Sequence, residues 1–201
     1  MHTTLRHELK RKTLHLLAGI LLVVLALYSQ ELGKRLVLLI LSFFLIALLE
    51  IEFIRIELKK KIPLIQDLWR KKEHNRIGGE VFFVIGGILS IGIFDTNIAV
   101  AAILMTTFGD LAAALIGKAY GTHWLPYPKN KAWEGVLAEL GINLLIGFLT
   151  LPHPLLVIVM AFTATLVETF SIKLDDNLLI PLFAGFNAQI ILFLLQLFKL
   201  L

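Results

Sequence analysis

The chain has 201 residues, of which 58% are hydrophobic and only 17% are charged. A water-soluble domain carries about 25% charged and about 45–50% apolar residues, so this composition excludes a soluble globular enzyme and a disordered chain. The sequence contains no cysteine, which also excludes a disulfide scaffold, thiol catalysis and thiolate metal sites. We therefore expect an all-α, polytopic bundle of transmembrane helices.

Seven apolar stretches are candidates for spans that cross a hydrocarbon core of about 30 Å. They cover residues 13–29, 32–54, 79–94, 97–117, 133–150, 154–172 and 178–198. About seven spans leave room for almost nothing else, so we expect a single integral membrane domain over residues 1–201. The stretch 79–94 is the shortest and contains Gly86 and Gly87, which lower its helical propensity, so a re-entrant segment is its alternative.

Residues 1–29 combine a basic start with an apolar run, as a signal peptide does. No small-x-small cleavage site follows, and Tyr28, Gln30 and Glu31 occupy the positions where one is expected. We therefore expect a retained first span.

Lysine and arginine are distributed unevenly between the two sides of the predicted membrane. Of the 19, all but Lys34, Arg35 and Lys199 lie before the first span or in the segments after the second, fourth and sixth spans. The positive-inside rule then places the N-terminus in the cytoplasm and the C-terminus outside. Residues 59–72 interleave apolar and basic side chains, which predicts a segment lying on the membrane surface. A role of this segment in recruiting an anionic nucleotide is the alternative.

Acidic residues gather at the cytoplasmic level of the predicted bundle. An ionisable group at the bilayer centre costs at least about 2.5–3.5 kcal/mol, so such groups usually face a protein-lined cavity and mark function. The set comprises Glu80, Asp110, Glu134, Glu139, Glu168, Asp175 and Asp176, with His15 at the same level. One such residue alone can be a terminal side chain that reaches the headgroups, but a one-sided set favours a shared site. Carboxylates beside lysine and arginine are typical of a site for Mg²⁺, or another divalent cation, and a polyphosphate.

Two segments supply candidate parts of this site. In residues 109–121, Gly109, Ala113 and Gly117 recur every four residues and form a smooth helix face that permits close approach. Packing does not explain the charged side chain of Asp110 on that segment. Residues 129–135 form a basic loop that enters the fifth span, where the free N–H groups of a helix start favour an anion. The alternative for residues 109–121 is a role in packing alone, and the alternative for residues 129–135 is a solvated loop.

A third segment covers residues 168–182 and contains adjacent carboxylates at the start of the last span. Either Asp175 or Asp176 can cap the helix, and capping needs only one of them. Because both cannot point the same way on a helix, we expect only Asp176 to reach a metal. No phosphate-binding G-x-x-x-x-G-K-[ST] loop and no G-x-G-x-x-G occurs, so the nucleotide site is of another kind.

The order of these motifs resembles the polyprenol kinase family, which includes dolichol kinase, phytol and farnesol kinases and the CTP-dependent diacylglycerol kinase. The motifs are Arg11-Lys12-x-x-His15, Arg76-Ile-Gly-Gly79-Glu80, Gly109-Asp110-x-x-Ala113-x-x-x-Gly117, Lys131-x-x-Glu134-Gly135, and Glu168 through Asp176-Asn177 with Ile180-Pro181. The resemblance implies transfer of the γ-phosphoryl group of CTP, or of another nucleoside triphosphate, with a divalent cation. The acceptor would be a membrane lipid alcohol: a polyprenol or dolichol, a phytol-like isoprenoid alcohol, or diacylglycerol.

The residue pattern and the resemblance together give the expected roles. We expect Asp110 and Asp176 to hold Mg²⁺, with Glu134 as an optional third ligand. Glu168 or His15 would accept the proton of the lipid hydroxyl. The residues expected to bind nucleotide or phosphate are Arg76, Gly109, Gly117, Lys118, Gly121, Lys131, Gly135 and Asn177.

Two other functions fit parts of the sequence. A cytidylyltransferase that makes a CDP-lipid needs the same metal and nucleotide, but the attack falls on the α-phosphate. A small transporter or channel would place polar groups near the midplane, whereas this sequence lacks matching polar groups in its outer half. Nucleic acid is not an expected partner, and the sequence does not determine the oligomeric state.

Overall fold

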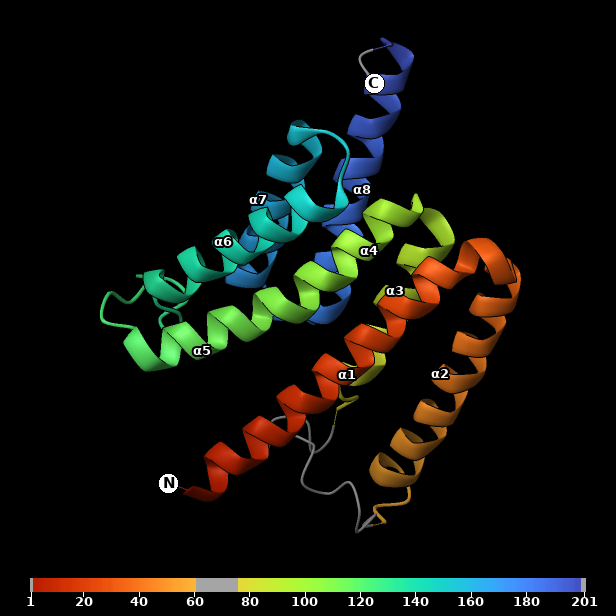
Figure 1. Cartoon of the computed structure of the whole chain (residues 1–201). Coiled ribbons are helices and arrows are strands. Elements are labelled where there is room, and N and C mark those ends of the chain that lie inside the picture. Colours follow the sequence, from red (N-terminus) through yellow and green to blue (C-terminus); the bar gives the residue numbers. More distant parts are fainter. Residues whose placement is uncertain (1, 61–75, 200–201) are drawn as a thin grey trace.

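The computed structural model describes residues 2–60 and 76–199, and these residues form helices joined by short loops (Figure 1). The helices are α1 (His2–Leu32), α2 (Lys34–Ile56), α3 (Gly79–Ile93), α4 (Thr96–Leu104), the π-helical turn η3 (Met105–Gly109), α5 (Asp110–Tyr120), α6 (Trp133–Thr150), α7 (Pro154–Phe170) and α8 (Asp176–Leu197). Because α4, η3 and α5 form one continuous rod, each predicted span corresponds to one helical rod. The described part of the chain has no strand, and its one isolated β-bridge joins Trp124 and Ala132.

Five of the rods are long and apolar enough to cross a membrane. They are Arg11–Leu32, Lys34–Ile56, Thr96–Tyr120, Trp133–Thr150 and Asp176–Leu197. The helices α3 and α7 are apolar but shorter, and the 15 residues of α3 extend over about 22 Å at 1.5 Å per residue. The all-α polytopic fold class is confirmed, whereas the number of spans and their orientation stay predictions. The predicted surface segment 59–72 lies, beyond residue 60, outside the described residues.

The rods are arranged around the α4–η3–α5 rod (Figure 1). Helices α1 and α2 form an antiparallel hairpin that turns at Gly33, whose φ of +87° suits a residue without a Cβ. On the other side of the rod lie α6, α7 and α8, and α3 packs against both α2 and α8. Figure 1 thus shows the hairpin and the α6–α8 group on opposite sides of one central helix.

Side-chain size is distributed as in a protein surrounded by lipid. The interior contains many small residues, among them Ala101, Ala164 and Ala184, each 0% exposed. Large apolar side chains such as Phe43 and Leu149 are exposed on the outside. Small interior residues let helices approach closely, which is how helices associate when lipid removes the hydrophobic driving force.

At the end of the bundle opposite the acidic cluster, polar side chains link neighbouring turns by hydrogen bonds. Gln189 of α8 exchanges two hydrogen bonds with Asp95, at 2.8 Å to its backbone nitrogen and at 2.7 Å to its carboxylate. Lys34 donates to the carbonyl oxygen of Phe94 at 3.1 Å, and Gln30 donates to Thr96 at 3.1 Å. These contacts tie the α1–α2 turn to the α3–α4 turn and to α8.

A π-helical turn interrupts the central rod directly before Asp110. Within it, Thr106 and Thr107 donate their hydroxyls to the carbonyls of Ala102 and Ile103 at 2.8 and 2.7 Å. Both hydroxyls thereby find acceptors within the buried rod. Such turns often occur at functional sites, and this one ends at Gly109, directly before Asp110.

Candidate active site

Asp110 forms an ion pair with a lysine that lies 98 positions earlier in the chain. Lys12 Nζ on α1 lies 2.5 Å from Asp110 Oδ2 and also donates to the Asp110 carbonyl at 3.2 Å. Lys12 is only 8% exposed, so the pair is shielded from water. Pairing with a buried cation keeps the carboxylate in its charged form in a low-dielectric environment. The α1 helix therefore reaches the centre of the predicted site.

A second buried ion pair joins the loop before α6 to the end of α7. Lys131 Nζ lies 2.9 Å from Glu168 Oε1 and also donates to the Glu168 carbonyl. The other carboxylate oxygen, Oε2 of Glu168, is buried and has no hydrogen-bond partner. A bound cation is one explanation for a buried carboxylate oxygen without a donor.

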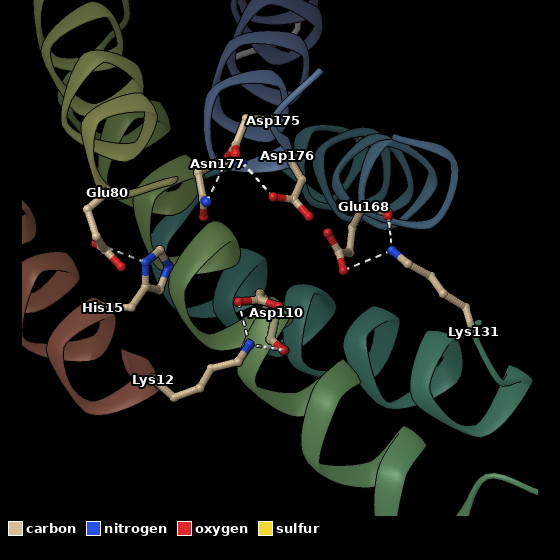
Figure 2. A network of polar contacts seen from close by, with 9 residues as sticks. All are labelled: Lys12, His15, Glu80, Asp110, Lys131, Glu168, Asp175, Asp176 and Asn177. Atoms are coloured by element: carbon tan, nitrogen blue, oxygen red, sulfur yellow. Dashed lines mark hydrogen bonds and ion pairs between the residues drawn. The ribbon is translucent and has the colours of Figure 1, made fainter. Parts of the chain in front are cut away.

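The start of α8 separates the roles of its two aspartates. Asp175 caps the helix, because its Oδ1 accepts hydrogen bonds from Asn177 at 3.1 Å (backbone) and 2.8 Å (side chain). Asp176 Oδ1 accepts from the same backbone nitrogen at 3.0 Å. In Figure 2 the Asp176 side chain extends toward Glu168. The expected capping by one aspartate is confirmed, and Asp176 remains the candidate metal ligand.

His15 lies on the opposite side of Asp110 from Lys131 (Figure 2). Its Nδ1 lies 3.5 Å from Glu80 Oε2 at the start of α3. Its ring packs on Phe83 with the ring centroids 4.2 Å apart. The helices α1, α3, α5, α7 and α8 thus each bring at least one ionisable side chain to the same place.

Glu139 is a buried carboxylate to which the sequence argument gave no role. It is 1% exposed on α6, close enough to Asp110, Lys131 and Asp176 to interact with them electrostatically. Gly135, Glu139 and Asn143 are spaced by four residues and therefore share one helix face. That face is buried, and the spacing is the signal that would have identified it.

The structure does not bring Glu134 to Asp110 and Asp176. Its Oε1 accepts from the Thr122 hydroxyl at 2.7 Å and from the backbone nitrogens of Thr122 and His123 at 3.2 and 3.1 Å, and it lies 2.8 Å from His123 Nδ1. The carboxylate is thereby occupied in holding the loop after α5. The place in the site that was expected for Glu134 is taken by Glu139, five residues further along α6.

The predicted glycines lie at helix crossings. A Cβ added to Gly135 would lie 2.8 Å from the Ala113 carbonyl oxygen and 3.1 Å from Gly117 Cα. A Cβ on Gly109 would lie 2.7 Å from Asn143 Oδ1. These distances leave no room for a side chain, so the glycines set how closely α5, η3 and α6 approach. Gly121 serves the same region, since a Cβ there would collide with the carbonyl of Gly117.

A pocket of about 180 Å³ opens between α5, α6 and the α7 terminus. Its lining includes the ionisable side chains Asp110, Lys118, Lys131, Glu139 and Glu168, the polar Asn130, and the small residues Ala113, Ala114, Gly117 and Gly135. Arg76 does not line it: the side chain is exposed, and its carbonyl accepts a hydrogen bond from Arg55. The pocket therefore combines carboxylates, two lysines and a wall of small apolar residues.

The donor set suits a metal that is shared with a substrate. In the described ranges 2–60 and 76–199, no group of three or more His, Cys, Asp or Glu could hold a metal ion by itself. Mg²⁺ binds one or two carboxylates and completes its shell with water and phosphate oxygens. The unpartnered Oε2 of Glu168, with Asp110 and Asp176 close enough to interact with Glu168, is compatible with that arrangement.

The chain is similar to lipid kinases from fungi and a cyanobacterium. It is 28% identical over 144 residues to "CTP-dependent diacylglycerol kinase 1" of Saccharomyces cerevisiae, covering 70% of this chain and 49% of the relative. It is 27% identical to the protein of the same name from Schizosaccharomyces pombe, over 59% of this chain and 62% of the relative. It is 30% identical over 138 residues to "Phytol kinase" of Synechocystis sp., over 62% of this chain and 58% of the relative.

These relatives confirm the resemblance to the polyprenol kinase family. The chain spans between about half and three fifths of the length of these relatives. No family model and no solved structure matches the chain.

Proposed function

We propose that this protein is a CTP-dependent lipid kinase that transfers the γ-phosphoryl group of CTP to the hydroxyl of a membrane lipid alcohol. The observation that carries the proposal is the convergence of five charged side chains from five separate segments: Asp110, Glu168 and Asp176 with Lys12 and Lys131. Asp110, Lys131 and Glu168 of this set also line the pocket. The names of the relatives supply CTP as the donor and a lipid as the acceptor.

The charges of the pocket fit a metal-bound triphosphate. In the proposal, Lys118 and Lys131 bind phosphate oxygens, and Lys131 exchanges part of its pairing with Glu168 for this contact. Asp110 and Asp176 would hold Mg²⁺, which when bound neutralises charge on the outer phosphates. Positioning and charge neutralisation are the main requirements of phosphoryl transfer.

The small residues of α5 let a substrate come close to the charged groups, and the acceptor can stay in the bilayer. Ala113, Ala114 and Gly117 line the pocket beside the charged groups. A lipid alcohol can bring its hydroxyl to this level while its tail remains among the exposed apolar side chains of the helices. Polyprenols, phytol-like alcohols and diacylglycerol all have this character, so the choice among them is left to the experiment.

The proposal is tested by incubating purified protein in vesicles with Mg²⁺, γ-labelled CTP and a panel of lipid alcohols. We expect label on at least one lipid, and none when the label is in the α position. Transfer of α-label to lipid would instead identify a cytidylyltransferase. Solute flux into vesicles without nucleotide, with no labelled lipid, would identify a transporter.

A further inference from the structure

His15 is a buried polar side chain that the proposed phosphate and metal contacts do not use. It is 2% exposed, and neither of its ring nitrogens has a hydrogen-bond partner. Burying a polar group without a partner is costly, so such a group requires an explanation, of which a catalytic role is one. His15 is also close enough to Asp110 to interact with it electrostatically.

The surroundings of His15 fix the direction of its ring. Phe83 packs on one ring face at a centroid distance of 4.2 Å and an interplanar angle of 36°. Nδ1 lies 3.5 Å from Glu80 Oε2, and Figure 2 shows the ring between Glu80 and Asp110. A proton on Nδ1 that faces Glu80 leaves the lone pair of Nε2 available. Contacts of this kind are often long without substrate and shorten in the complex.

We infer that His15 is the catalytic base for the acceptor alcohol and that Glu80 is its positioning residue. The inference rests on the proposed function. The lipid hydroxyl would bind between Nε2 of His15 and the carboxylate of Asp110, on the face of Asp110 opposite the pocket that holds Lys118 and Lys131. Donor and acceptor then approach from two sides of Asp110.

The step balances as an ordinary phosphoryl transfer. The lipid oxygen forms a bond to the γ-phosphorus, and the bond from that phosphorus to the β,γ-bridging oxygen breaks. The hydroxyl proton passes to Nε2 of His15, and the nucleoside diphosphate leaves with the bridging oxygen. The charged groups near His15 are Glu80 from α3 and Asp110 from α5, and Arg11 and Lys12 precede it by four and three residues on its own helix.

Glu168 is the other carboxylate that the sequence offered as a base, and its contacts favour a different role. Lys131 donates to both its carboxylate and its carbonyl. This contact engages the carboxylate in joining the loop before α6 to the end of α7. His15 has no such competing cation contact in the described part of the chain.

The test compares His15→Ala and His15→Gln with the wild-type protein in vesicles that contain Mg²⁺ and the lipid accepted by the wild type. We expect kcat to fall by about 10²–10⁴-fold in both variants, which is the usual contribution of general-base catalysis. The Kd for CTP, measured without lipid, stays within about twofold because His15 lies away from Lys131. Added imidazole restores part of kcat to His15→Ala, where it can occupy the vacated space, and not to His15→Gln.

Two further variants complete the experiment. Glu80→Gln lowers kcat and leaves the KM for CTP and for the lipid unchanged, and Glu80→Asp recovers part of kcat, as a positioning role requires. His153→Asn is the matched control: His153 caps α7 by accepting from the Leu155 nitrogen, and asparagine is also a good cap, so full activity is expected.

The inference is overturned if His15→Gln keeps more than a tenth of the wild-type kcat, or if the variants lose CTP binding instead of turnover. Should His15→Ala fail to fold, His15→Gln and the Glu80 pair still decide the matter. If the wild type itself transfers no γ-label to any lipid, the proposed function fails; if only the His15 predictions fail, the kinase remains and its base lies elsewhere.

Discussion

Each of the two central lysines binds one carboxylate from a distant part of the chain. Lys12 holds Asp110 and Lys131 holds Glu168, with separations of 98 and 37 residues. Removing one partner of a buried pair leaves an uncompensated charge, which typically costs about 3–5 kcal/mol. Variants at these positions therefore need a stability measurement beside every activity measurement.

Asp110→Asn is expected to abolish phosphoryl transfer. The amide cannot supply the negative charge that Mg²⁺ needs, and losses at metal centres exceed the 10–100-fold typical of their outer partners, so we expect more than about 100-fold. The measurement is the initial rate of lipid labelling from γ-labelled CTP, with thermal unfolding in detergent as the stability control. A correctly folded Asp110→Asn protein with full activity would remove Asp110 from the mechanism.

Lys131→Ala is expected to weaken CTP binding, with Lys129→Ala as its matched control. Charge-assisted hydrogen bonds are worth about 1.5–3 kcal/mol, which corresponds to roughly a 10–100-fold increase in the KM for CTP. Lys129 lies two residues away on the same loop but is exposed and does not line the pocket of Asp110, so its removal leaves the KM within about twofold. The double variant Lys131→Ala/Glu168→Gln distinguishes the two effects: it should regain stability and keep the high KM. Equal effects of the two single lysine variants would show that only the net charge of the loop matters.

The helices α5 and α6 meet where neither backbone carries a Cβ. Gly117 and Gly135 face each other at this crossing, with Gly117 placing an added Cβ only 3.6 Å from Gly135 Cα. Because Lys118 follows Gly117 and Glu139 lies one turn after Gly135, the crossing also fixes the two walls of the pocket. These glycines therefore affect both the packing of the two helices and the shape of the pocket.

Gly135→Val is expected to reduce both stability and activity, whereas Gly141→Ala on the same helix is not. A valine at 135 has to move the Ala113 carbonyl, and overpacking of this kind typically costs about 1–3 kcal/mol. A Cβ on Gly141 meets nothing within 4 Å. Thermal unfolding in detergent and the rate of lipid labelling check both variants. If Gly135→Val matched Gly141→Ala in both measurements, the crossing would not determine the shape of the pocket.

Local patterns predicted the helices well and the side-chain partners less well. The sequence placed the starts and ends of the rods within a few residues over most of the chain, because apolar runs and interrupting charges depend on neighbouring positions. The π-turn before Asp110 has no local signature in the sequence. The contacts of Glu134 with Thr122 and His123 depend on how the loop between α5 and α6 folds back. The spacing of Lys131, Glu134 and Gly135 in the sequence does not reveal them.

The same distinction holds for the candidate site. The one-sided placement of acidic residues predicted one shared site. Asp110 and Asp176 are close enough to Glu168 to interact with it, whereas Glu134 is held by Thr122 and His123. Glu139 was noticed as an acidic residue, but its role depended on recognising the buried face that it shares with Gly135 and Asn143. Long-range pairs such as Lys12 with Asp110 are set by the tertiary arrangement and cannot be found from one helix.

At the scale of the whole molecule, the fold lacks a complete metal site of its own among the described residues. Chelation of divalent cations is therefore expected to abolish transfer while leaving the fold intact, since the ion is shared with the phosphates and contributes little to the protein alone. EDTA should stop lipid labelling, added Mg²⁺ should restore it, and the unfolding temperature should change by no more than a degree or two. Persistent labelling in EDTA would exclude the proposed metal.

The orientation of the bundle is the remaining prediction, and the absence of cysteine makes it directly measurable. The excess of lysine and arginine at one end predicts that the loop before α6, with the pocket beside it, faces the cytoplasm. Single cysteines at the exposed positions Glu31 and Lys129 report the two sides without a background signal. In intact cells a membrane-impermeant maleimide should label Glu31→Cys, and it should label Lys129→Cys only after permeabilisation. The reverse pattern would place the carboxylates outside, where CTP from the cytoplasm does not reach them, and the lipid-kinase proposal would then lose its donor.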